Sequence, residues 1–273
     1  MLGVLVLRLR VERGGHYSMF PGKLLHGALF RCIAAYNALL AGDLHERRVK
    51  PFTVGMLRRA GKSCGAVPQT RELNEPHYTA GEKLLLRLTA LDEDVLFAFL
   101  HIPCGTQLAV GKLIFTVEEV LANGQEDTGC VEVEELIAAA LSMEEVTQFR
   151  ISFRSPTVFR VDNADCAVPR PELIFASLAD KWTWQRLPSV LDKAYVRGVA
   201  AKLTPLEWRG AGLRIRQSAQ KTVPGFMGDF TFRMDRLSAE EREIILLLAQ
   251  FAPFCGTGRL TAQGFRETQI VFS

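Results

Sequence analysis

A glycine-rich segment near the end of the chain has the residue types of an anion-binding loop. It reads FCGTGRLTAQGF, from Phe254 to Phe265. Because glycine has no Cβ and tolerates positive φ, the backbone amides at Gly256, Gly258 and Gly264 can approach a phosphate closely, with Arg259 beside them. The alternative is a β-bulge or wide turn that binds no ligand.

Two common nucleotide-binding motifs are excluded in this segment. The spacing G-x-G-x-x-G is absent because Thr261 stands three residues after Gly258, and there is no Gly-Lys-Ser/Thr of a P-loop. A short β-rich run follows Gly264, whereas a dinucleotide site requires a helix there. The segment is therefore predicted to be a glycine-rich loop that leads into a final strand.

Charge is distributed along the chain in blocks. Residues 1–91 carry 14 Lys and Arg against 6 Asp and Glu, residues 92–146 carry 1 against 12, and residues 147–233 carry 14 against 7. The net charge of +3 therefore conceals two basic segments separated by an acidic one. Basic surfaces on two units can flank a polyanion while the acidic part faces away; ordinary solvated charge is the alternative.

Composition indicates a cytoplasmic protein without a membrane segment. The six cysteines stand singly with no C-x-x-C pair, which favours reduced thiols and no zinc or other metal site. No apolar run is long enough to span a membrane, and the apolar N-terminus alternates with Arg8 and Arg10 as a strand does. No cofactor is expected.

The first part of the chain predicts an α+β unit. Helical spacing from Lys23 onwards places Leu25, Leu29, Ile33 and Tyr36 on one apolar face. The other predicted elements are strands over 5–11, 51–57, 83–91, 107–110 and 113–117, and helices over 92–101 and 132–142.

The second part repeats this outline. The predicted strands cover 147–154, 199–208, 212–217, 228–234 and the C-terminus, and the predicted helices cover 173–184, 189–198 and 238–250, the last opened by a capping box of Ser238 and Glu241. Strand, helix, two strands, helix, strand is the ferredoxin-like order. We therefore expect two tandem ferredoxin-like (RRM-like) domains packed side by side, over residues 1–143 and 144–273.

Several motifs occur in an order that resembles a known family. They are the glycine-rich loop over 256–265, FRSPT over 153–157, PGFMG over 224–228, Leu25-His26, Leu44-His45 and KPFTV over 50–54. Together they resemble the CRISPR-associated repeat-RNA endoribonucleases (the Cas six family). The loop of this family often carries a further Gly where Arg266 stands here.

The resemblance implies metal-independent cleavage of precursor CRISPR RNA within each repeat. The 2′-hydroxyl next to the scissile phosphate would be the nucleophile, and the products would carry 5′-hydroxyl and cyclic phosphate ends. The implied partners are the repeat RNA, proteins of a CRISPR effector complex and a second copy of the chain. The alternatives are a family member that binds the repeat without cutting it, and a tandem ferredoxin-like scaffold or metabolic protein.

His26 and His45 lie in the region where the resembled family places its catalytic histidines, and Lys50, Arg47 and Arg48 are candidates to supply positive charge. Histidine suits proton transfer because its ordinary pKa of about 6.5 allows both forms near neutrality. On one straight helix the two histidines would lie roughly 28 Å apart, so the chain must fold back. We expect a break at Asn37, as the N-cap of a second helix over 38–45. Which histidine is the acid stays open, and His26 as a structural residue is the alternative.

Arginines on predicted strands are the candidates for RNA binding. Arg214 and Arg216 alternate on one strand face, and Arg150 and Arg154 lie on another strand. The full set of candidates is Arg150, Arg154, Arg214, Arg216, Lys221, Gly256, Gly258, Arg259 and Gly264. A solvated sheet edge is the alternative.

Overall fold

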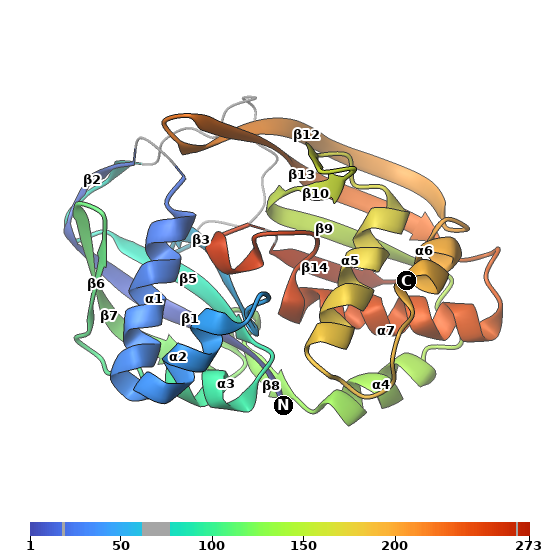
Figure 1. Ribbon diagram of the computed structural model, residues 1–273, viewed down its shortest axis with the longest axis horizontal. Helices are drawn as coiled ribbons and strands as arrows, with labels where there is room; N and C mark the ends of the chain where they lie inside the picture. The colour runs from blue at the N-terminus through green and yellow to red at the C-terminus, as the bar shows by residue number, and fades with distance from the viewer. Residues whose placement is uncertain (18–19, 62–76, 266) are drawn as a thin grey trace.

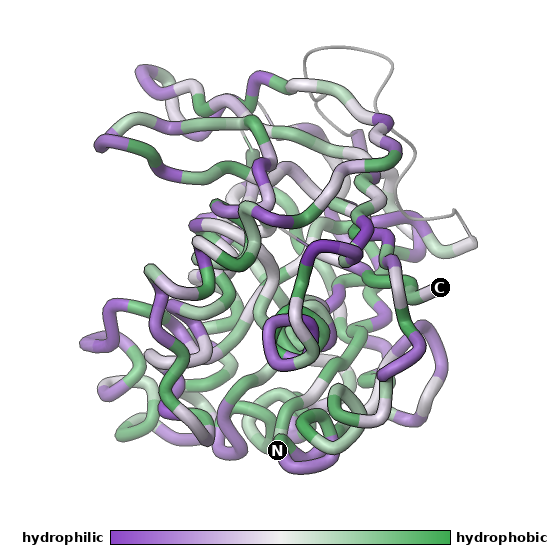
Figure 2. The backbone as a smooth tube through the Cα atoms, turned by 90° about the vertical axis from the view of Figure 1, so that its right-hand side faces the viewer, coloured by the Kyte–Doolittle hydropathy of each residue, from purple (hydrophilic) through white to green (hydrophobic). Residues whose placement is uncertain are grey.

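The computed structural model describes residues 1–17, 20–61, 77–265 and 267–273. Within them the chain forms a six-stranded and a four-stranded antiparallel sheet, besides two small two-stranded ribbons. The two larger sheets lie side by side, one in each half of the chain, and helices pack against both (Figure 1). Hydrophilic residues lie mainly along the outer turns of the trace (Figure 2).

The first half has the ferredoxin-like topology. Its sheet has the order β3-β5-β1-β7-β6, with β8 paired to the start of β1. The elements are β1 (Leu2–Arg13), β2 (Gly15–His16), α1 (Gly22–Tyr36), α2 (Ala38–Glu46), β3 (Phe52–Arg59), β4 (His77–Tyr78), β5 (Lys83–Ala90), α3 (Glu93–Leu100), β6 (Gln107–Val110), β7 (Leu113–Leu121), η1 (Gln125–Asp127), β8 (Gly129–Val131) and α4 (Val133–Leu141). Apolar residues of β1, such as Leu7 and Leu9, pack against Leu29 and Ile33 of α1 and Phe99 of α3.

The second half repeats this topology. Its sheet has the order β12-β13-β9-β14, which matches the order β3-β5-β1-β7 of the first half strand for strand. The elements are β9 (Gln148–Thr157), β10 (Phe159–Val161), β11 (Ala164–Cys166), α5 (Pro171–Trp184), α6 (Lys193–Ala200), β12 (Thr204–Ser218), β13 (Lys221–Arg233), α7 (Ala239–Cys255), η2 (Thr261–Gln263) and β14 (Thr268–Phe272). The prediction of two tandem ferredoxin-like domains packed side by side is confirmed.

Several local predictions are wrong. The strand predicted over 228–234 begins already at Lys221, as β13. The strands predicted over 199–208 and 212–217 are one long strand, β12, which begins only after α6 has ended at Ala200. The strand is continuous because its pairing with β13 runs through Gly210 and Gly212. Gly210 packs under the ring of Phe226, where a Cβ would lie 2.2 Å from that ring. Helix α7 continues beyond residue 250 to Cys255. Tyr36, predicted in the core, is 47% exposed and lies against the ring of His101.

The two halves contact each other through β5 and the end of α7. Arg87 on β5 donates to the carbonyl oxygen of Pro253 at 3.0 Å, and the Thr89 hydroxyl donates to that of Phe254. Leu2 and Leu91 of the first half lie in the hydrophobic core of the second. Among the described helices, none combines the length and apolar character needed to cross a membrane.

We propose the domain boundary between residues 143 and 144, in the turn between α4 and β9. Helix α4 lies before this boundary and packs against α7, with Leu136 and Ala140 in the core of the second half. The proposed first domain therefore reaches across to the second through its last helix.

Gly258 provides a test of the backbone conformation of the glycine-rich loop. Its φ is +73°, and a Cβ there would lie 2.6 Å from the carbonyl oxygen of Val158. We expect Gly258→Ala to lower the free energy of unfolding by about 1–3 kcal/mol, because an L side chain is strained in this region and meets backbone. Thermal and urea unfolding would measure the change.

Gly42 is the matched control for this substitution. It lies within α2, and a Cβ there would meet no atom within 4 Å. Gly42→Ala should raise the free energy of unfolding by up to about 1 kcal/mol, because alanine favours the helix. Equal stability of the two variants would contradict the importance of the loop conformation.

Candidate functional site

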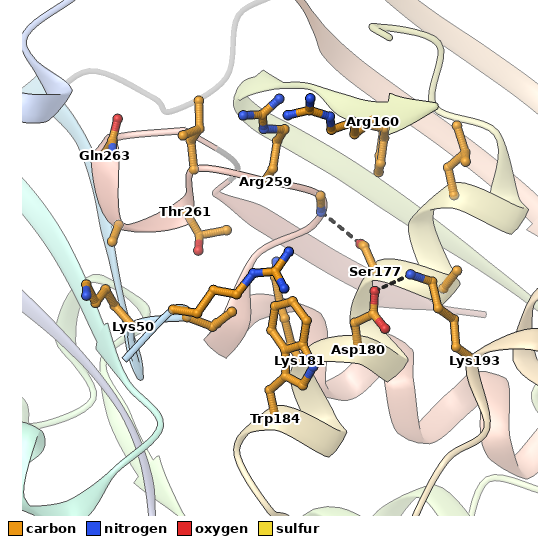
Figure 3. A pocket seen from close by; sticks show the side chains of 18 of the residues that line it. Lys50, Arg160, Ser177, Asp180, Lys181, Trp184, Lys193, Arg259, Thr261 and Gln263 are labelled. Atoms are coloured by element: carbon orange, nitrogen blue, oxygen red, sulfur yellow. Dashed lines mark hydrogen bonds and ion pairs between the residues drawn. The ribbon is translucent and has the colours of Figure 1, made fainter. Parts of the chain in front are cut away.

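A pocket of about 590 Å³ lies between the two halves of the chain. The glycine-rich loop (residues 256–265) forms one wall, and α5 and α6 form another (Figure 3). The first half contributes the side chain of His26 from α1 and the segment Arg48 to Lys50 that connects α2 with β3. The pocket is therefore built from residues that are far apart in the sequence.

The lining of this pocket is strongly basic. Among the lining residues that the structure describes, Asp180 is the one carboxylate, and it pairs with Lys193. Against it stand seven basic side chains: Arg48, Lys50, Arg160, Lys181, Lys193, Arg197 and Arg259. Such a concentration of positive charge in a concave site attracts anions.

Much of the basic charge in the first segment is neutralised elsewhere. Ion pairs join Arg8 to Glu119, Arg10 to Glu118 and Arg47 to Asp92. The acidic block over 92–146 therefore offsets arginines of β1 and of the turn after α2. The excess charge of residues 1–91 overstates the basic surface of this half.

The glycine-rich loop bends sharply where it leaves α7. The backbone is left-handed at Gly258, Leu260 and Gly264, with φ between 71° and 77°, and Gly256 also has a positive φ of 62°. Lys181, buried on α5, binds the carbonyl oxygens of Cys255 and Gly256 at 3.2 and 2.5 Å. A buried cation thus stabilises the C-terminal end of α7, where carbonyl groups lack helical partners.

The amides at Gly256, Gly258 and Arg259 of this loop are bonded within the protein. The N–H of Gly258 donates to the Ser177 hydroxyl at 2.8 Å, and the N–H of Arg259 donates to the carbonyl oxygen of Val158 at 3.2 Å. The N–H of Gly256 donates back into α7. These contacts favour a loop that positions side chains over one whose amides at these three residues bind a phosphate. Arg266 lies outside the described residues.

The loop reaches across to the first half and contacts His26. The His26 Nδ1 atom lies 2.9 Å from the carbonyl oxygen of Ala262. Because a carbonyl oxygen only accepts, Nδ1 carries the proton, and the neutral ring has its lone pair on Nε2. Burial lowers the pKa of His26, with smaller effects in the same direction from Lys50 and His45, while the bond to Ala262 opposes the shift.

Both predicted histidines lie against the ring of Phe30. The ring of Phe30 is 4.8 Å from that of His26 and 6.4 Å from that of His45, between centroids. This arrangement depends on the predicted break at Asn37, whose side chain accepts from the N–H groups of Leu39 and Leu40 and begins α2. His45 is exposed and is not among the residues lining the pocket.

Lys50 closes the end of α2. Its ammonium group donates to the carbonyl oxygens of Leu44, His45 and Arg47 at 2.6 to 2.9 Å. Burial lowers the pKa of Lys50. The side chain also lines the pocket and lies 6.0 Å from the centroid of the Phe30 ring. Lys50 therefore both stabilises the helix end that carries His45 and adds positive charge to the pocket.

The other predicted residues lie in two places. Arg259 lines the pocket and pairs with Asp165 at 2.5 Å. Arg214 and Arg216 are exposed on β12, while the neighbouring Leu213 and Ile215 are buried, so the predicted alternation is correct. Arg150 and Arg154 on β9 and Lys221 on β13 are not among the pocket-lining residues either, and Arg154 Nε donates to Gln269 at 3.0 Å.

Part of the site was missed by the sequence analysis. Ser177, Lys181 and Trp184 follow each other at spacings of four and three, so they share one face of α5, a pattern that the sequence already contained. Arg160 and Arg197 carry no such signal. They reach the pocket only because β10 and α6 fold against α5.

Comparisons with known proteins agree with this architecture. The family model of CRISPR-associated endoribonuclease Cas6 matches residues 151–265. A product complex of the Thermus thermophilus Cas6 is 27% identical, covers 99% of this chain and 100% of its own, and has a TM-score of 0.76. A second Cas6 in a product complex, at 22% identity with 99% of each chain covered and a TM-score of 0.73, shows the same fold. No curated protein matches the chain.

The matched segment contains β10, α5, α6 and the glycine-rich loop, which supply the pocket-lining residues of the second half. It also contains the whole of β12, β13 and α7. The structural similarity extends over both halves. This match, the shared tandem topology and the motifs of the loop make the chain similar to the CRISPR-associated Cas6 endoribonucleases.

Proposed function

We propose that this protein binds CRISPR repeat RNA and cuts precursor CRISPR RNA within the repeat. The observation that carries the proposal is the position of His26. It lines a basic pocket between the two halves, where the loop carbonyl of Ala262 orients its ring. The match of the Cas6 family model and the similarity to the product complex of the Thermus protein support an RNA-cleaving role.

Cleavage proceeds by attack of a ribose 2′-hydroxyl on the adjacent phosphate, without a metal ion. His26 accepts the 2′-hydroxyl proton at Nε2, and the O2′–P bond forms. The bond between phosphorus and the 5′-oxygen then breaks, and His45 donates a proton to that oxygen. The products carry a cyclic phosphate and a 5′-hydroxyl. Lys50 adds positive charge near the phosphorane.

This assignment of base and acid follows from the surroundings of the two rings. A base must be neutral, and burial favours the neutral form of His26. The exposed His45 is open to water and to an approaching RNA strand. Both rings contact the ring of Phe30, so the proposed acid and base lie in the same region of the first half.

The remaining candidates bind RNA away from the cleaved bond. Arg214, Arg216 and Lys221 contact phosphates from the β12–β13 hairpin, and Arg150 and Arg154 extend this surface across the sheet. Within the pocket, Arg259 contributes charge, while Gly256, Gly258 and Gly264 hold the loop in place. The protein acts in the cytoplasm, with proteins of a CRISPR effector complex and a second copy of the chain as further partners.

Loss of either histidine should slow cleavage strongly. His26→Ala and His45→Ala should each reduce the single-turnover rate on the repeat RNA of the encoding genome by about 10²- to 10⁴-fold, because each removes one general acid or base. RNA affinity should change little, since a neutral imidazole adds little charge. His101→Ala, at the exposed C-cap of α3, is the control and should keep the wild-type rate.

The nucleophile and the role of metal ions are tested with the same RNA. A 2′-deoxy sugar at the cleaved position should abolish cutting and leave binding intact, and cutting should continue in chelator. A wild-type protein that binds the RNA and never cuts it would support the alternative of a non-cleaving repeat-RNA-binding protein. Rates for His26→Ala and His45→Ala within a few-fold of wild type would refute both roles.

The rate of cleavage should fall as the pH is lowered. His26 acts as a base only when unprotonated, and its pKa lies below the ordinary value of 6.5. The acidic limb of the rate profile should therefore have its midpoint below pH 6.5, with full activity of this group above it. Single-turnover rates from about pH 4.5 to about pH 8 measure this limb. A midpoint above 6.5 would contradict His26 as the base.

RNA affinity should depend steeply on salt. Each neutralised phosphate of a single strand contributes about −0.7 to the slope of log K against log salt. The double variant Arg214→Ala with Arg216→Ala should therefore weaken binding and make the slope shallower by about 1.4. Lys112→Ala, in the exposed turn between β6 and β7, is the control. A flat salt response of the wild-type protein would argue against the proposed surface.

A further inference from the structure

A half-exposed tryptophan forms part of the pocket wall. Trp184, the last residue of α5, lines the pocket with 48% of its surface exposed. The guanidinium carbon of Arg48, from the first half, lies 5.4 Å from the centroid of its ring. Figure 3 shows the tryptophan at the lower side of the pocket, below the glycine-rich loop. A large apolar ring kept open to solvent at a basic pocket suits an aromatic ligand.

Positive charge surrounds the space next to this ring. Arg160 on β10 and Arg197 on α6 both line the pocket, and among the described residues neither has an ion pair with a carboxylate. Asp180, the acidic lining residue, is already paired with Lys193. Guanidinium groups without carboxylate partners favour a phosphate ligand, which they bind through parallel N–H donors.

The size of the pocket limits what can enter it. At about 590 Å³ it falls within the range of sites that enclose one small organic molecule. A double helix is far wider than such a pocket, whereas one unpaired nucleotide combines the flat base and the phosphate that this lining can bind. Proteins recognise unpaired RNA bases by stacking them on aromatic rings and on arginine planes.

We propose that this pocket binds one unpaired nucleotide of the RNA substrate. The base stacks on the surface formed by Trp184 and Arg48, and the phosphate lies toward Arg160 and Arg197. Because His26 lines the same pocket, a nucleotide bound here determines which neighbouring phosphate reaches the catalytic histidine. This inference rests on the proposed RNA-cleaving function and adds a determinant of the cleavage position.

A purely structural role for the tryptophan predicts a different result. In that case the contact of Trp184 with Arg48 only holds the two halves together, and no base touches it. The two roles differ in one respect. Only if a base stacks on Trp184 does the effect of Trp184→Ala on RNA affinity depend on the presence of one particular base. A double-mutant cycle between protein and RNA therefore separates them.

The first measurement is the affinity for the repeat RNA of the encoding genome, made non-cleavable by a 2′-deoxy sugar at the cleaved position. Trp184→Ala should weaken binding by roughly 5- to 150-fold, the effect of losing one base–aromatic stack. Trp184→Phe keeps an aromatic ring and should bind within a few-fold of wild type. Trp208→Ala removes a 68% exposed tryptophan outside the pocket lining and should leave affinity unchanged. Melting temperatures verify that each variant is folded.

The second measurement replaces each unpaired nucleotide of this RNA, in turn, by an abasic one. At one position, the abasic substitution should weaken binding to the wild-type protein by a similar factor. The same substitution should cause no further loss of affinity for the Trp184→Ala variant. In cleavable RNA, the same abasic substitution should lead to cleavage at more than one phosphate. Additive losses at every position, or wild-type affinity of Trp184→Ala, would overturn the proposal.

Two further outcomes show whether the ligand is RNA or a free nucleotide, and whether a negative result refutes this inference or the proposed function. Free AMP and UMP offer the same base and phosphate, and they should bind far more weakly than the RNA. Saturable binding of either that depends on Trp184, with no coupled abasic position, would assign the pocket to free nucleotides and overturn the RNA assignment. A wild-type protein that binds no repeat RNA would refute the proposed function itself, whereas binding and cutting that ignore Trp184 would refute only this inference.

Discussion

The path of the glycine-rich loop is the constraint on which the rest of the site depends. After α7 the chain must turn away from the core of the second half, touch α1 of the first half and return to form β14. Left-handed backbone at Gly258, Leu260 and Gly264 permits this path. Lys181 anchors its beginning, and the carbonyl oxygen of Ala262 orients His26 at its far side. The fold of one half thereby determines the orientation of a side chain in the other.

Charge in this protein is sorted by tertiary contacts. Arginines of β1 pair with glutamates of β7, whereas Arg48, Arg160 and Arg197 gather around the pocket without carboxylate partners among the described residues. Clustered like charges repel one another, so the fold must hold them in place through apolar packing and backbone bonds. An anionic ligand relieves this repulsion. The stability of the empty site and its affinity for a polyanion are therefore two effects of the same charge distribution.

The two halves share a topology but perform different tasks. In both, the four main strands follow one order, and helices cover the core. The first half carries the two candidate histidines, which both contact Phe30 because the chain folds back at Asn37. The second half supplies most of the positive charge and the loop that crosses between the sheets. The site therefore exists only where both halves are packed together, through β5, α7 and the loop.

The sequence alone was sufficient to predict the tandem ferredoxin-like order, the helix break at Asn37 and the alternation of Arg214 and Arg216, because periodicity and capping act between neighbouring residues. The prediction that Tyr36 is buried was wrong. Helical spacing shows which residues share a face of a helix, but it does not show how far along the helix the sheet covers that face. The assembly of His26, Arg160, Lys181 and Arg197 around one pocket was decided only by the tertiary structure. These residues lie on four elements separated by up to 171 positions, and they meet because two packed sheets and a bent loop bring them together.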